Sequence, residues 1–396
     1  EILDHSGDEP RSVVTHLPGE FTGDIDILTR RVTVVSAVAR GETDVLELAP
    51  SDIRRLIAED QAMGDVILQA FITRREQLVE SGFQGVRVIG SRNSRDTYRI
   101  REFLARNQVP MRWIDVDTDS GAGEMLEHFG VGDDALPVGL CAGQPPLRNP
   151  STRDLAQAVG LKRPLGTDVY DLVIIGAGPA GLAAAVYGSS EGLTTLLLDA
   201  DSPGGQAGAS NSIENYLGFP MGIKGAELTR AATLQAPKFA ARLSTPSPVV
   251  ALDDEGSHIT GRMDDGETAF ARCVLIATGA EYRKLDVPDR ERFEGIGVYY
   301  VATPTELEAC HGAQVVIVGA GNSAGQAAVF LAQNTQKVTI LVRRDNMRNT
   351  MSSYLIDRIE AAPNIDVLYT TQIREIHGDT RLENIVVENT TTGELR

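Results

Sequence analysis

The stretch that decides the fold of this 396-residue chain lies at residues 170–201 and reads YDLVIIGAGPAGLAAAVYGSSEGLTTLLLDAD. An apolar strand, a glycine loop and a helix of small residues follow one another, and a second apolar strand ends at Asp199. Gly176 allows a tight turn, Gly178 lets the backbone approach a pyrophosphate, and Gly181 lets the helix meet the strand. The helix N-terminus favours anionic phosphates, and Asp199 would bind a ribose hydroxyl. The stretch therefore predicts a dinucleotide-binding β-α-β unit.

A second unit of the same kind occupies residues 313–345, AQVVIVGAGNSAGQAAVFLAQNTQKVTILVRRD. Gly319, Gly321 and Ala324 form its G-x-G-x-x-A loop, again directly after an apolar strand. The next strand ends in basic residues instead of an acid: Arg343 and Arg344, with Arg348 close behind. Arginines without the acid suit the 2′-phosphate of NADPH, so NADPH is favoured over NADH. The alternative is that these arginines form a solvated turn.

Two dinucleotide loops, the first followed by an acid and the second by arginines, indicate FAD and NADPH in one hydride-transfer flavoprotein. Two further segments, PGGQAGASNSIENYLGFP at 203–220 and LIATGA at 275–280, match a known family without a gap. On these motifs, residues 168–396 resemble the low-molecular-weight thioredoxin reductases, which are pyridine-nucleotide flavoprotein oxidoreductases. The resemblance implies a flavin lobe that is split in sequence, an inserted NADPH lobe and a homodimer.

The loops and the resemblance together give the candidate cofactor ligands. For FAD they are Gly176, Gly178, Pro179, Ala180, Gly181, Asp199, Gly205, Gln206, Asn215, Thr278 and Gly279. For NADPH they are Gly319, Gly321, Asn322, Ser323, Ala324, Arg343, Arg344 and Arg348. The resemblance also implies that the flavin lobe returns after residue 396 with a Gly-Asp motif. We therefore expect residues 1–396 to bind FAD weakly or not at all by themselves.

The redox dithiol of that family, Cys-Ala-Thr-Cys, has no counterpart in this chain. Residues 297–304 read GVYYVATP, so the central Ala-Thr keeps the register while Val301 and Pro304 stand at the two cysteine positions. Valine has no redox chemistry, and proline lacks the amide hydrogen that could stabilise a nearby thiolate. Cys310 is a single thiol and cannot cycle as an internal dithiol. No catalytic residue is therefore predicted.

Three functions remain open at this point. The first is an FAD- and NADPH-dependent oxidoreductase that passes electrons to a non-disulfide acceptor, such as a small redox protein or a quinone. Ferredoxin–NADP reductases of the thioredoxin-reductase type lack the dithiol in the same way. The second is thioredoxin-disulfide reduction with thiols outside this segment. The third is a non-enzymatic regulator that senses flavin or nucleotide. The retained NADPH arginines favour the first, because a scaffold has no chemical need for them.

Residues 83–160 predict the element order β-α-β-α-β-β-α, which resembles the thioredoxin/glutaredoxin fold. Pro137 matches that family's cis-proline position. The redox pair would fall within Ser91–Ser94, but this stretch reads S-R-N-S and holds no sulfur. An exposed dithiol is the whole chemistry of that fold. We therefore expect a docking or scaffolding unit.

Residues 1–80 contain short β-branched runs, an expected strand at 42–49, and an amphipathic helix expected to run unbroken from Ser51 past Phe71. This order resembles the second half of a cyclic-nucleotide-binding domain, and the stretch from Gly19 to Asp24 resembles its phosphate-binding cassette. The family's arginine position falls on Thr33 and Val34, with Arg30 and Arg31 displaced. We expect a structural or contact-regulatory role, with a cyclic nucleotide as the alternative.

Composition excludes several classes of function. The net charge of −18, from 37 basic and 55 acidic residues, opposes binding to nucleic acid. No apolar run approaches the ~18 residues that a membrane span needs. The three cysteines, Cys141, Cys273 and Cys310, lie too far apart for a C-x-x-C pair, a zinc site or a disulfide scaffold. A cytoplasmic protein with no metal site is expected.

The predicted fold class is α/β, with two Rossmann-like, three-layer dinucleotide-binding lobes of the pyridine-nucleotide flavoprotein type. A thioredoxin-like domain and a partial β-roll plus helix precede them. The expected domains are residues 1–80, 83–160, 168–292 for the first part of the FAD lobe, and 293–396 for the NADPH lobe.

Overall fold

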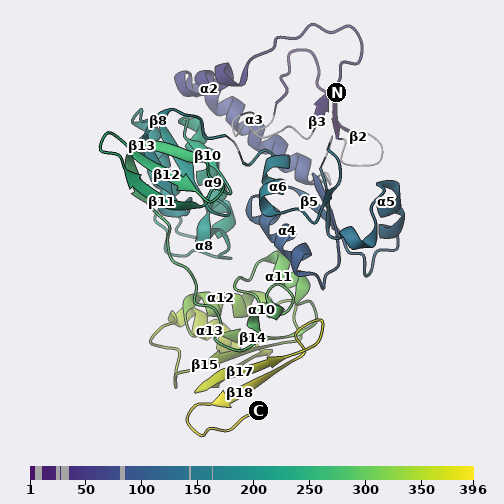
Figure 1. Ribbon diagram of the computed structural model, residues 1–396, viewed down its shortest axis with the longest axis vertical. Coiled ribbons are helices and arrows are strands. Elements are labelled where there is room, and N and C mark those ends of the chain that lie inside the picture. The colour runs from purple at the N-terminus through teal and green to yellow at the C-terminus, as the bar shows by residue number, and fades with distance from the viewer. Residues whose placement is uncertain (5–10, 24–26, 28–34, 81–84, 142–143, 163) are drawn as a thin grey trace. The chain divides into compact units, whose positions relative to one another are not determined.

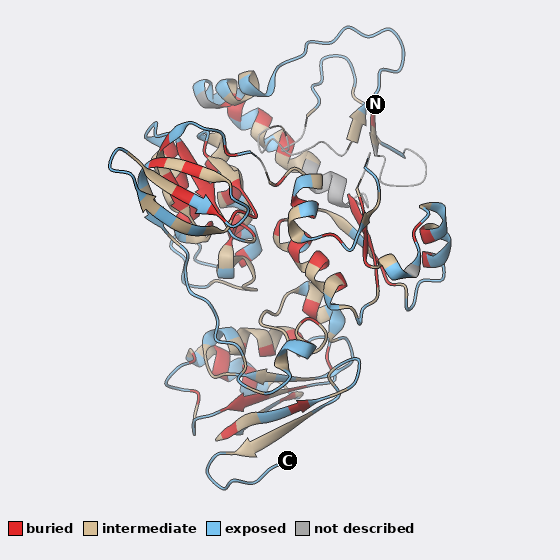
Figure 2. Ribbon diagram, in the orientation of Figure 1, coloured by how far each residue is buried: buried red, intermediate tan, exposed pale blue. Residues whose placement is uncertain are grey.

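A computed structural model describes residues 1–4, 11–23, 27, 35–80, 85–141, 144–162 and 164–396 of the chain (Figure 1). They form two compact units. The first comprises Glu1–Ser91, Arg99–Gly205 and Thr229–Gly279, and the second comprises Arg92–Tyr98, Gln206–Leu228 and Ala280–Arg396. Each unit therefore collects segments that are far apart in the sequence, and each holds one glycine loop. Figure 2 shows buried residues concentrated on the sheets and on the helix sides that face them.

The N-terminal part of the first unit contains an antiparallel sheet in the order β2-β1-β3. Its strands are β1 (Ile2–Asp4), β2 (Arg11–Val14) and β3 (Val35–Ala37). Two helices follow, α2 (Pro50–Glu59) and α3 (Gln61–Glu80). Ile57, Ile67 and Phe71 are buried in one apolar cluster formed by these helices. This cluster anchors the helices to the rest of the first unit through the partly buried Leu234.

Two predictions for this part are wrong. The expected strand at 42–49 has no regular structure, no described strand pairs with it, and Leu46 is 90% exposed. The single long helix is divided in two, since α2 ends at Glu59 and α3 begins at Gln61. A β-carbon at Gly64 would lie 2.6 Å from the Ile57 carbonyl oxygen. The glycine therefore lets the start of α3 lie against α2, and the amphipathic spacing alone does not report this break.

Residues 86–158 form a four-stranded sheet in the order β5-β4-β6-β7, in which only β4 and β5 are parallel. The strands are β4 (Val86–Ile89), β5 (Met111–Ile114), β6 (Val138–Leu140) and β7 (Leu147–Arg148). The helices are α4 (Arg95–Arg106), α5 (Ala122–His128) and α6 (Thr152–Ala158). The element order is the expected β-α-β-α-β-β-α. The peptide bond between Leu136 and Pro137 is cis.

Alternation along β4 sends its side chains to two separate apolar clusters. Val86 and Val88 pack with residues of α4 and α6, while Ile89 packs with residues of α5. This is the two-residue period of a strand whose faces are both covered. Helix α6 begins with a capping box, in which the Ser151 hydroxyl accepts the Asp154 amide and the Asp154 carboxylate accepts the Ser151 amide.

The first glycine loop belongs to a six-stranded sheet in the order β10-β9-β8-β13-β12-β11. Its strands are β8 (Val169–Ile175), β9 (Thr195–Leu198), β10 (Arg242–Ser244), β11 (Val249–Asp254), β12 (Ile259–Met263) and β13 (Thr268–Ile276). Its helices are α7 (Pro179–Ser190), α8 (Gly205–Gly208) and α9 (Gly225–Lys238). Ile174 and Leu197 face the helices, whereas Val173 and Leu196 pack with residues of β12 and β13. Helix residues therefore pack on one face of β8 and β9, and residues of β12 and β13 pack on the opposite face.

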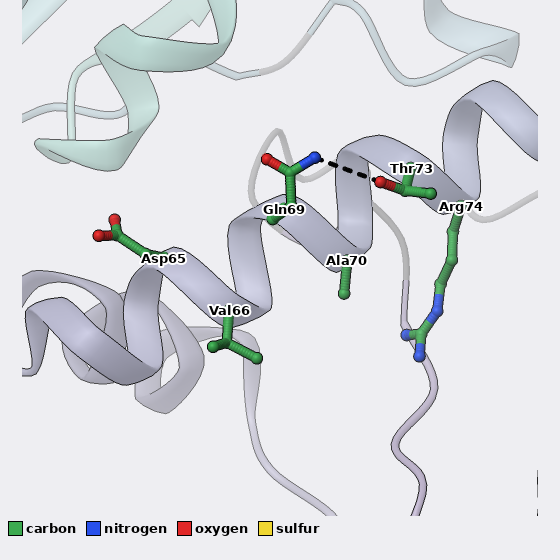
Figure 3. Close-up of a pocket in the computed structure, with 6 residues that line it drawn as sticks. All are labelled: Asp65, Val66, Gln69, Ala70, Thr73 and Arg74. Atoms are coloured by element: carbon green, nitrogen blue, oxygen red, sulfur yellow. Dashed lines mark hydrogen bonds between the residues drawn. The ribbon is translucent and has the colours of Figure 1, made fainter.

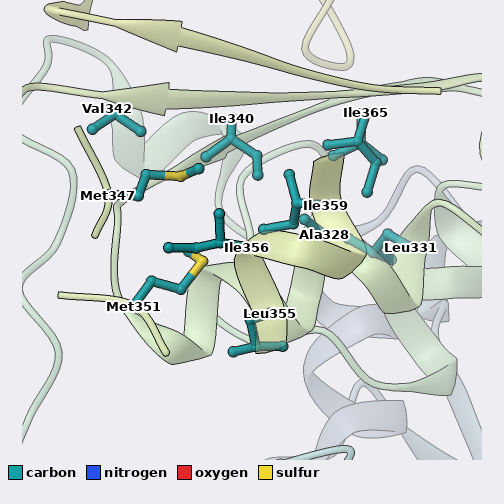
Figure 4. Packing of buried hydrophobic residues seen from close by; sticks show 11 residues of the cluster. Ala328, Leu331, Ile340, Val342, Met347, Met351, Leu355, Ile356, Ile359 and Ile365 are labelled. Atoms are coloured by element: carbon teal, nitrogen blue, oxygen red, sulfur yellow. The ribbon is translucent and has the colours of Figure 1, made fainter. Parts of the chain in front are cut away.

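The second glycine loop belongs to a parallel sheet in the order β14-β15-β16. The strands are β14 (Gln314–Val318), β15 (Lys337–Val342) and β16 (Ile365–Tyr369), followed by a hairpin of β17 (Thr371–His377) and β18 (Asn384–Asn389). The helices are α10 (Arg290–Phe293), α11 (Pro304–Ala309), α12 (Asn322–Leu331) and α13 (Ser353–Ala361). Ile340, Val342, Leu355, Ile356 and Ile359 are buried where α13 packs on β15 (Figure 4). Two methionines, Met347 and Met351, fill this core beside them.

Candidate functional site

The first glycine loop joins β8 to α7, and packing dictates two of its three glycines. Gly176 has a φ of +104°, and a β-carbon there would lie 2.3 Å from the Ala277 carbonyl oxygen. At Gly181 a β-carbon would lie 1.8 Å from the Gly176 carbonyl oxygen. At Gly178 it would meet none of the described atoms within 4 Å, so space for a phosphate remains. Two further candidate ligands, Pro179 and Ala180, are the first two residues of α7.

Asp199 follows β9 and holds the glycine loop by hydrogen bonds. Its Oδ2 accepts the Ala177 amide at 2.6 Å, and its Oδ1 accepts the amides of Asp201 and Ser202 at 2.9 Å each. Burial raises the pKa of Asp199 and the charge of Asp201 adds to the rise, although the three amide hydrogen bonds act against it. A carboxylate has about four acceptor positions, so a ribose hydroxyl can still be bound. The sequence pattern identified the acid but missed its structural role.

Three more of the candidate flavin ligands meet at this loop within the first unit. A β-carbon at Gly205 would lie 3.1 Å from the α-carbon of Gly178, and one at Gly176 would lie 3.0 Å from the α-carbon of Thr278. Gly279 comes next, with a φ of +70°. Thr278 and Gly279 are exposed. Segments some 30 and 100 residues beyond the loop in sequence therefore come together at one edge of the sheet.

The other two candidate flavin ligands lie in the second unit. The side-chain amide of Gln206 donates to the Ala280 carbonyl, and Asn215 is exposed. The same loop provides a contact that the sequence did not indicate, because Asn211 Nδ2 donates to the Ala302 carbonyl at 3.0 Å. The loop at 203–220 is therefore hydrogen-bonded directly to the segment 301–304, which contains no cysteine.

The second glycine loop joins β14 to α12. Gly319 has a φ of +137°, and a β-carbon there would lie 3.5 Å from the Ala324 β-carbon. Gly321 is the N-cap of α12, and a β-carbon there would meet no described atom within 4 Å. Asn322 Oδ1 accepts the Ser352 amide at 2.7 Å, and its Nδ2 donates to the Ser352 hydroxyl at 3.0 Å. The loop thus leaves space for a phosphate at a helix N-terminus, and Ser352 fixes its shape.

The remaining NADPH candidates are exposed side chains. Ser323 lies in the first turn of α12, and Arg343 and Arg344 directly follow β15. Arg348 lies 3.7 Å from the Glu360 carboxylate. Within the described part of the chain, neither Arg343 nor Arg344 has an ion-pair partner. Both guanidinium groups can therefore bind an anionic ligand without breaking an ion pair.

The two dithiol positions lie at the start of a short helix. Thr303 is the N-cap of α11, and Pro304 occupies its first turn, where no amide hydrogen is needed. The Glu306 carboxylate is 2% exposed and accepts the Thr303 amide at 2.7 Å and the Tyr98 hydroxyl at 2.9 Å. Val301 is partly buried and precedes this cap. The segment is therefore built as a packed helix start without a thiol.

The cysteines offer no substitute for the missing pair. All three are free thiols, and only Cys273 is exposed. Burial raises the pKa of Cys141 to about 11. Burial, assisted by the charge of Glu306, raises the pKa of Cys310 to about 11 as well. Because the thiolate is the nucleophile, these two partly buried thiols are poorly reactive at neutral pH.

The N-terminal candidates can be placed only in part. In the cyclic-nucleotide cassette, Gly19 to Gly23 are described, while Asp24, Arg30, Arg31, Thr33 and Val34 lie outside the described residues. A surface hollow occurs on α3 and is lined by Asp65, Val66, Gln69, Ala70, Thr73 and Arg74. Figure 3 shows that this one helix supplies all of the lining side chains, with Gln69 donating to Thr73 at 3.3 Å. A single helix face does not surround a ligand.

In the 83–160 segment, the sulfur-free stretch is hydrogen-bonded at its first residue. Ser91 Oγ donates to Asp117 Oδ2 at 2.6 Å. Among the described residues, no group of three or more His, Cys, Asp or Glu side chains could hold a metal ion. No helix in that part of the chain is long and apolar enough to span a bilayer.

Comparison with known proteins covers the part of the chain that carries both glycine loops. The family model of the pyridine nucleotide-disulphide oxidoreductases matches residues 170–396. The thioredoxin reductase of Bacillus subtilis is 37% identical over 233 residues, which are 57% of this chain and 70% of that protein. The thioredoxin reductase of Streptomyces coelicolor is 34% identical over 235 residues, 58% of this chain and 70% of that protein.

A solved structure gives the same result. The Lactococcus lactis thioredoxin reductase in its FR conformation superposes with a TM-score of 0.54 at 32% identity, covering 57% of this chain and 73% of that one. The sheets described above are those of the Rossmann-type flavoprotein fold, and the family uses FAD and NADPH. The chain belongs to the pyridine nucleotide-disulphide oxidoreductases and is an NADPH-dependent flavoprotein oxidoreductase.

Proposed function

We propose that the protein oxidises NADPH with bound FAD and passes the electrons to a non-disulfide acceptor, either a small redox protein or a quinone. When bound, FAD supplies the chemistry that accepts a hydride and releases electrons to such an acceptor. The chain's own residues bind and orient the two nucleotides. Open space at Gly178 and Gly321 receives the phosphates, and Arg343 and Arg344 receive the 2′-phosphate.

The observation that carries this proposal is the packed helix start at 301–306. Thr303 and Glu306 form a capping box at the start of α11. The Thr303 side chain accepts backbone amides of the first turn, and the Glu306 carboxylate accepts the Thr303 amide. Pro304 lies in that first turn. Neither Val301 nor Pro304 can form a disulfide. The partly buried Cys310 is held as a thiol by its raised pKa of about 11. Electrons from the flavin therefore have no internal disulfide to enter within the described residues.

Stopped-flow mixing of the full-length, FAD-loaded protein with NADPH tests the proposal. We expect rapid bleaching of the flavin, then turnover with ferricyanide or a benzoquinone and none with oxidised thioredoxin. Turnover of thioredoxin would contradict the proposal and support a disulfide reductase that uses thiols outside this segment. A flavin that NADPH does not bleach would indicate a regulatory protein instead.

A designed variant provides the matched control. Replacing Val301→Cys and Pro304→Cys restores the Cys-Ala-Thr-Cys order at the same helix start. We expect this double variant to gain reduction of a small aromatic disulfide while keeping flavin bleaching by NADPH. If the double variant reduces the disulfide and the unaltered protein does not, the absence of the two cysteines is the reason that the unaltered protein lacks this activity.

We also propose that residues 83–160 form a thioredoxin-like unit without redox chemistry, and that the protein is a homodimer. The strand order β5-β4-β6-β7 and the element order β-α-β-α-β-β-α support the first statement. The second follows from the resemblance to the thioredoxin reductases, and light scattering on the full-length protein checks it. Calorimetry with cyclic AMP and cyclic GMP tests the N-terminal part, for which we expect no binding in the micromolar range.

A further inference from the structure

The loop that carries Asp199 is held by the end of α4, a helix of the 83–160 segment. Arg106 Nη1 lies 2.6 Å from Asp201 Oδ2. Asn107 Nδ2 donates to the Asp201 carbonyl at 3.2 Å, and Thr245 Oγ1 donates to the same carbonyl at 3.0 Å. All of these residues belong to the first unit. The carboxylate and the backbone carbonyl of Asp201 are therefore both held by residues outside its own loop.

The end of α4 is built to hold these contacts. The helix ends at Arg106, and Gln108 has a φ of +55°, so the backbone turns away directly afterwards. Asn107 is 1% exposed, and its Nδ2 also donates to the Phe103 carbonyl at 2.9 Å. A buried amide with two acceptors in fixed directions positions the Asp201 carbonyl closely.

Asp201 in turn contacts the side chain of Asp199, the candidate ribose ligand. Its amide and the Ser202 amide donate to Asp199 Oδ1, while Asp199 Oδ2 accepts the Ala177 amide in the glycine loop. A displaced Asp201 would therefore move both the Asp199 carboxylate and the loop that it holds. The charge of Asp201 also disfavours the ionised form of Asp199, and the guanidinium of Arg106 opposes that charge.

We propose that Arg106 and Asn107 are positioning residues for FAD. They hold Asp201 so that Asp199 presents its carboxylate to the ribose of the adenosine half. The 83–160 segment thereby contributes to the flavin site although it holds no redox pair of its own. This inference rests on the proposed function, because it requires that the first glycine loop binds FAD.

Titration of the full-length apo-protein with FAD, followed by quenching of flavin fluorescence, tests the inference. We expect Arg106→Ala to raise the FAD dissociation constant about three- to tenfold, and Arg106→Lys to recover most of the loss because the charge is retained. Arg106 is chosen because it is one-third exposed, whereas loss of the buried Asn107 endangers folding. In a protein that already carries Asp199→Asn, adding Arg106→Ala should hardly change the FAD dissociation constant, because Arg106 acts on FAD only through Asp199.

The chain offers a matched control in Arg153→Ala. Arg153 also belongs to the 83–160 segment, lies 2.6 Å from Asp264 on the six-stranded sheet side, and is similarly exposed. In the described part of the chain its ion-pair partners are Asp264 and Asp265 and not Asp201, so its loss should leave FAD affinity unchanged. The inference is overturned if Arg106→Ala binds FAD as tightly as the unaltered protein, or if Arg153→Ala loses as much affinity as Arg106→Ala. Either result leaves the proposed function intact. An unaltered protein that does not bind FAD refutes the proposed function itself.

Discussion

At the scale of single residues, the two nucleotide loops differ in how their charged groups are employed. The Asp199 carboxylate accepts hydrogen bonds from the backbone amides of Ala177, Asp201 and Ser202. Arg343 and Arg344 are exposed and have no ion-pair partner among the described residues. The acid is therefore part of the architecture of its loop, while the arginines are available to a ligand. This asymmetry predicts different costs of substitution.

Replacing Arg343→Ala or Arg344→Ala should raise the KM for NADPH about tenfold, because each removes a charge-assisted contact to the 2′-phosphate. The KM for NADH should change less than twofold, since NADH lacks that phosphate. Steady-state rates with ferricyanide as acceptor measure both constants. Arg374→Ala is the control, because Arg374 lies in the same unit, is not a candidate NADPH ligand and pairs with Glu388. Equal losses for NADPH and NADH would show that the two arginines only shape a turn.

At the scale of elements, helix α11 begins with a packed cap at the position where the family resemblance would place a dithiol. Its capping box is formed by Thr303 and Glu306, and the buried carboxylate of Glu306 also accepts the Tyr98 hydroxyl. Tyr98 and Tyr299 have their ring centroids 5.3 Å apart beside it. A thiol pair that cycles must be accessible to its partner, whereas these groups are packed. The element therefore contributes to stability instead of redox exchange.

We expect Glu306→Ala to lower the free energy of unfolding of the second unit by about 2–3 kcal/mol. The substitution removes the capping carboxylate, which accepts both the Thr303 amide and the Tyr98 hydroxyl. Urea unfolding followed by circular dichroism measures the change. Glu308→Ala, an exposed site on the same helix, should cost under about 0.5 kcal/mol. A similar cost at both sites would contradict the assignment of Glu306 as a structural cap.

At the scale of the whole molecule, two basic side chains, Arg153 in the 83–160 segment and Lys162 just after it, contact acids next to the six-stranded sheet within the first unit. Lys162 is 6% exposed, and its Nζ lies 2.9 Å from Asp265 and 2.8 Å from Glu267. Arg153 lies 2.6 Å from Asp264 at a more exposed position nearby. Burial makes the lysine network costly to disrupt, because removing one partner leaves desolvated charges unpaired.

Replacing Lys162→Met should therefore destabilise the first unit by about 2 kcal/mol or more, while Arg153→Met should cost under about 1 kcal/mol. The urea midpoint of the full-length protein reports both changes. Equal midpoints for the two variants would show that burial of Lys162 adds nothing.

The sequence by itself determined both β-α-β units, the register of the missing dithiol and the order of elements in residues 86–158. These features follow from local rules, because glycine spacing, apolar periodicity and helix caps act within about 30 residues. It misjudged the strand at 42–49 and the unbroken helix after Ser51, since a strand needs a partner and Gly64 allows a close backbone contact.

Only the tertiary structure decided what surrounds those loops. The contacts of Arg106 with Asp201, of Asn211 with Ala302 and of Tyr98 with Glu306 join residues about 90 to 210 positions apart. No periodicity or local spacing encodes a pair at that separation, because it forms only when separately folded elements pack together. Local sequence patterns therefore predict the nucleotide loops and their cofactors, while packing determines which distant residues contact those loops.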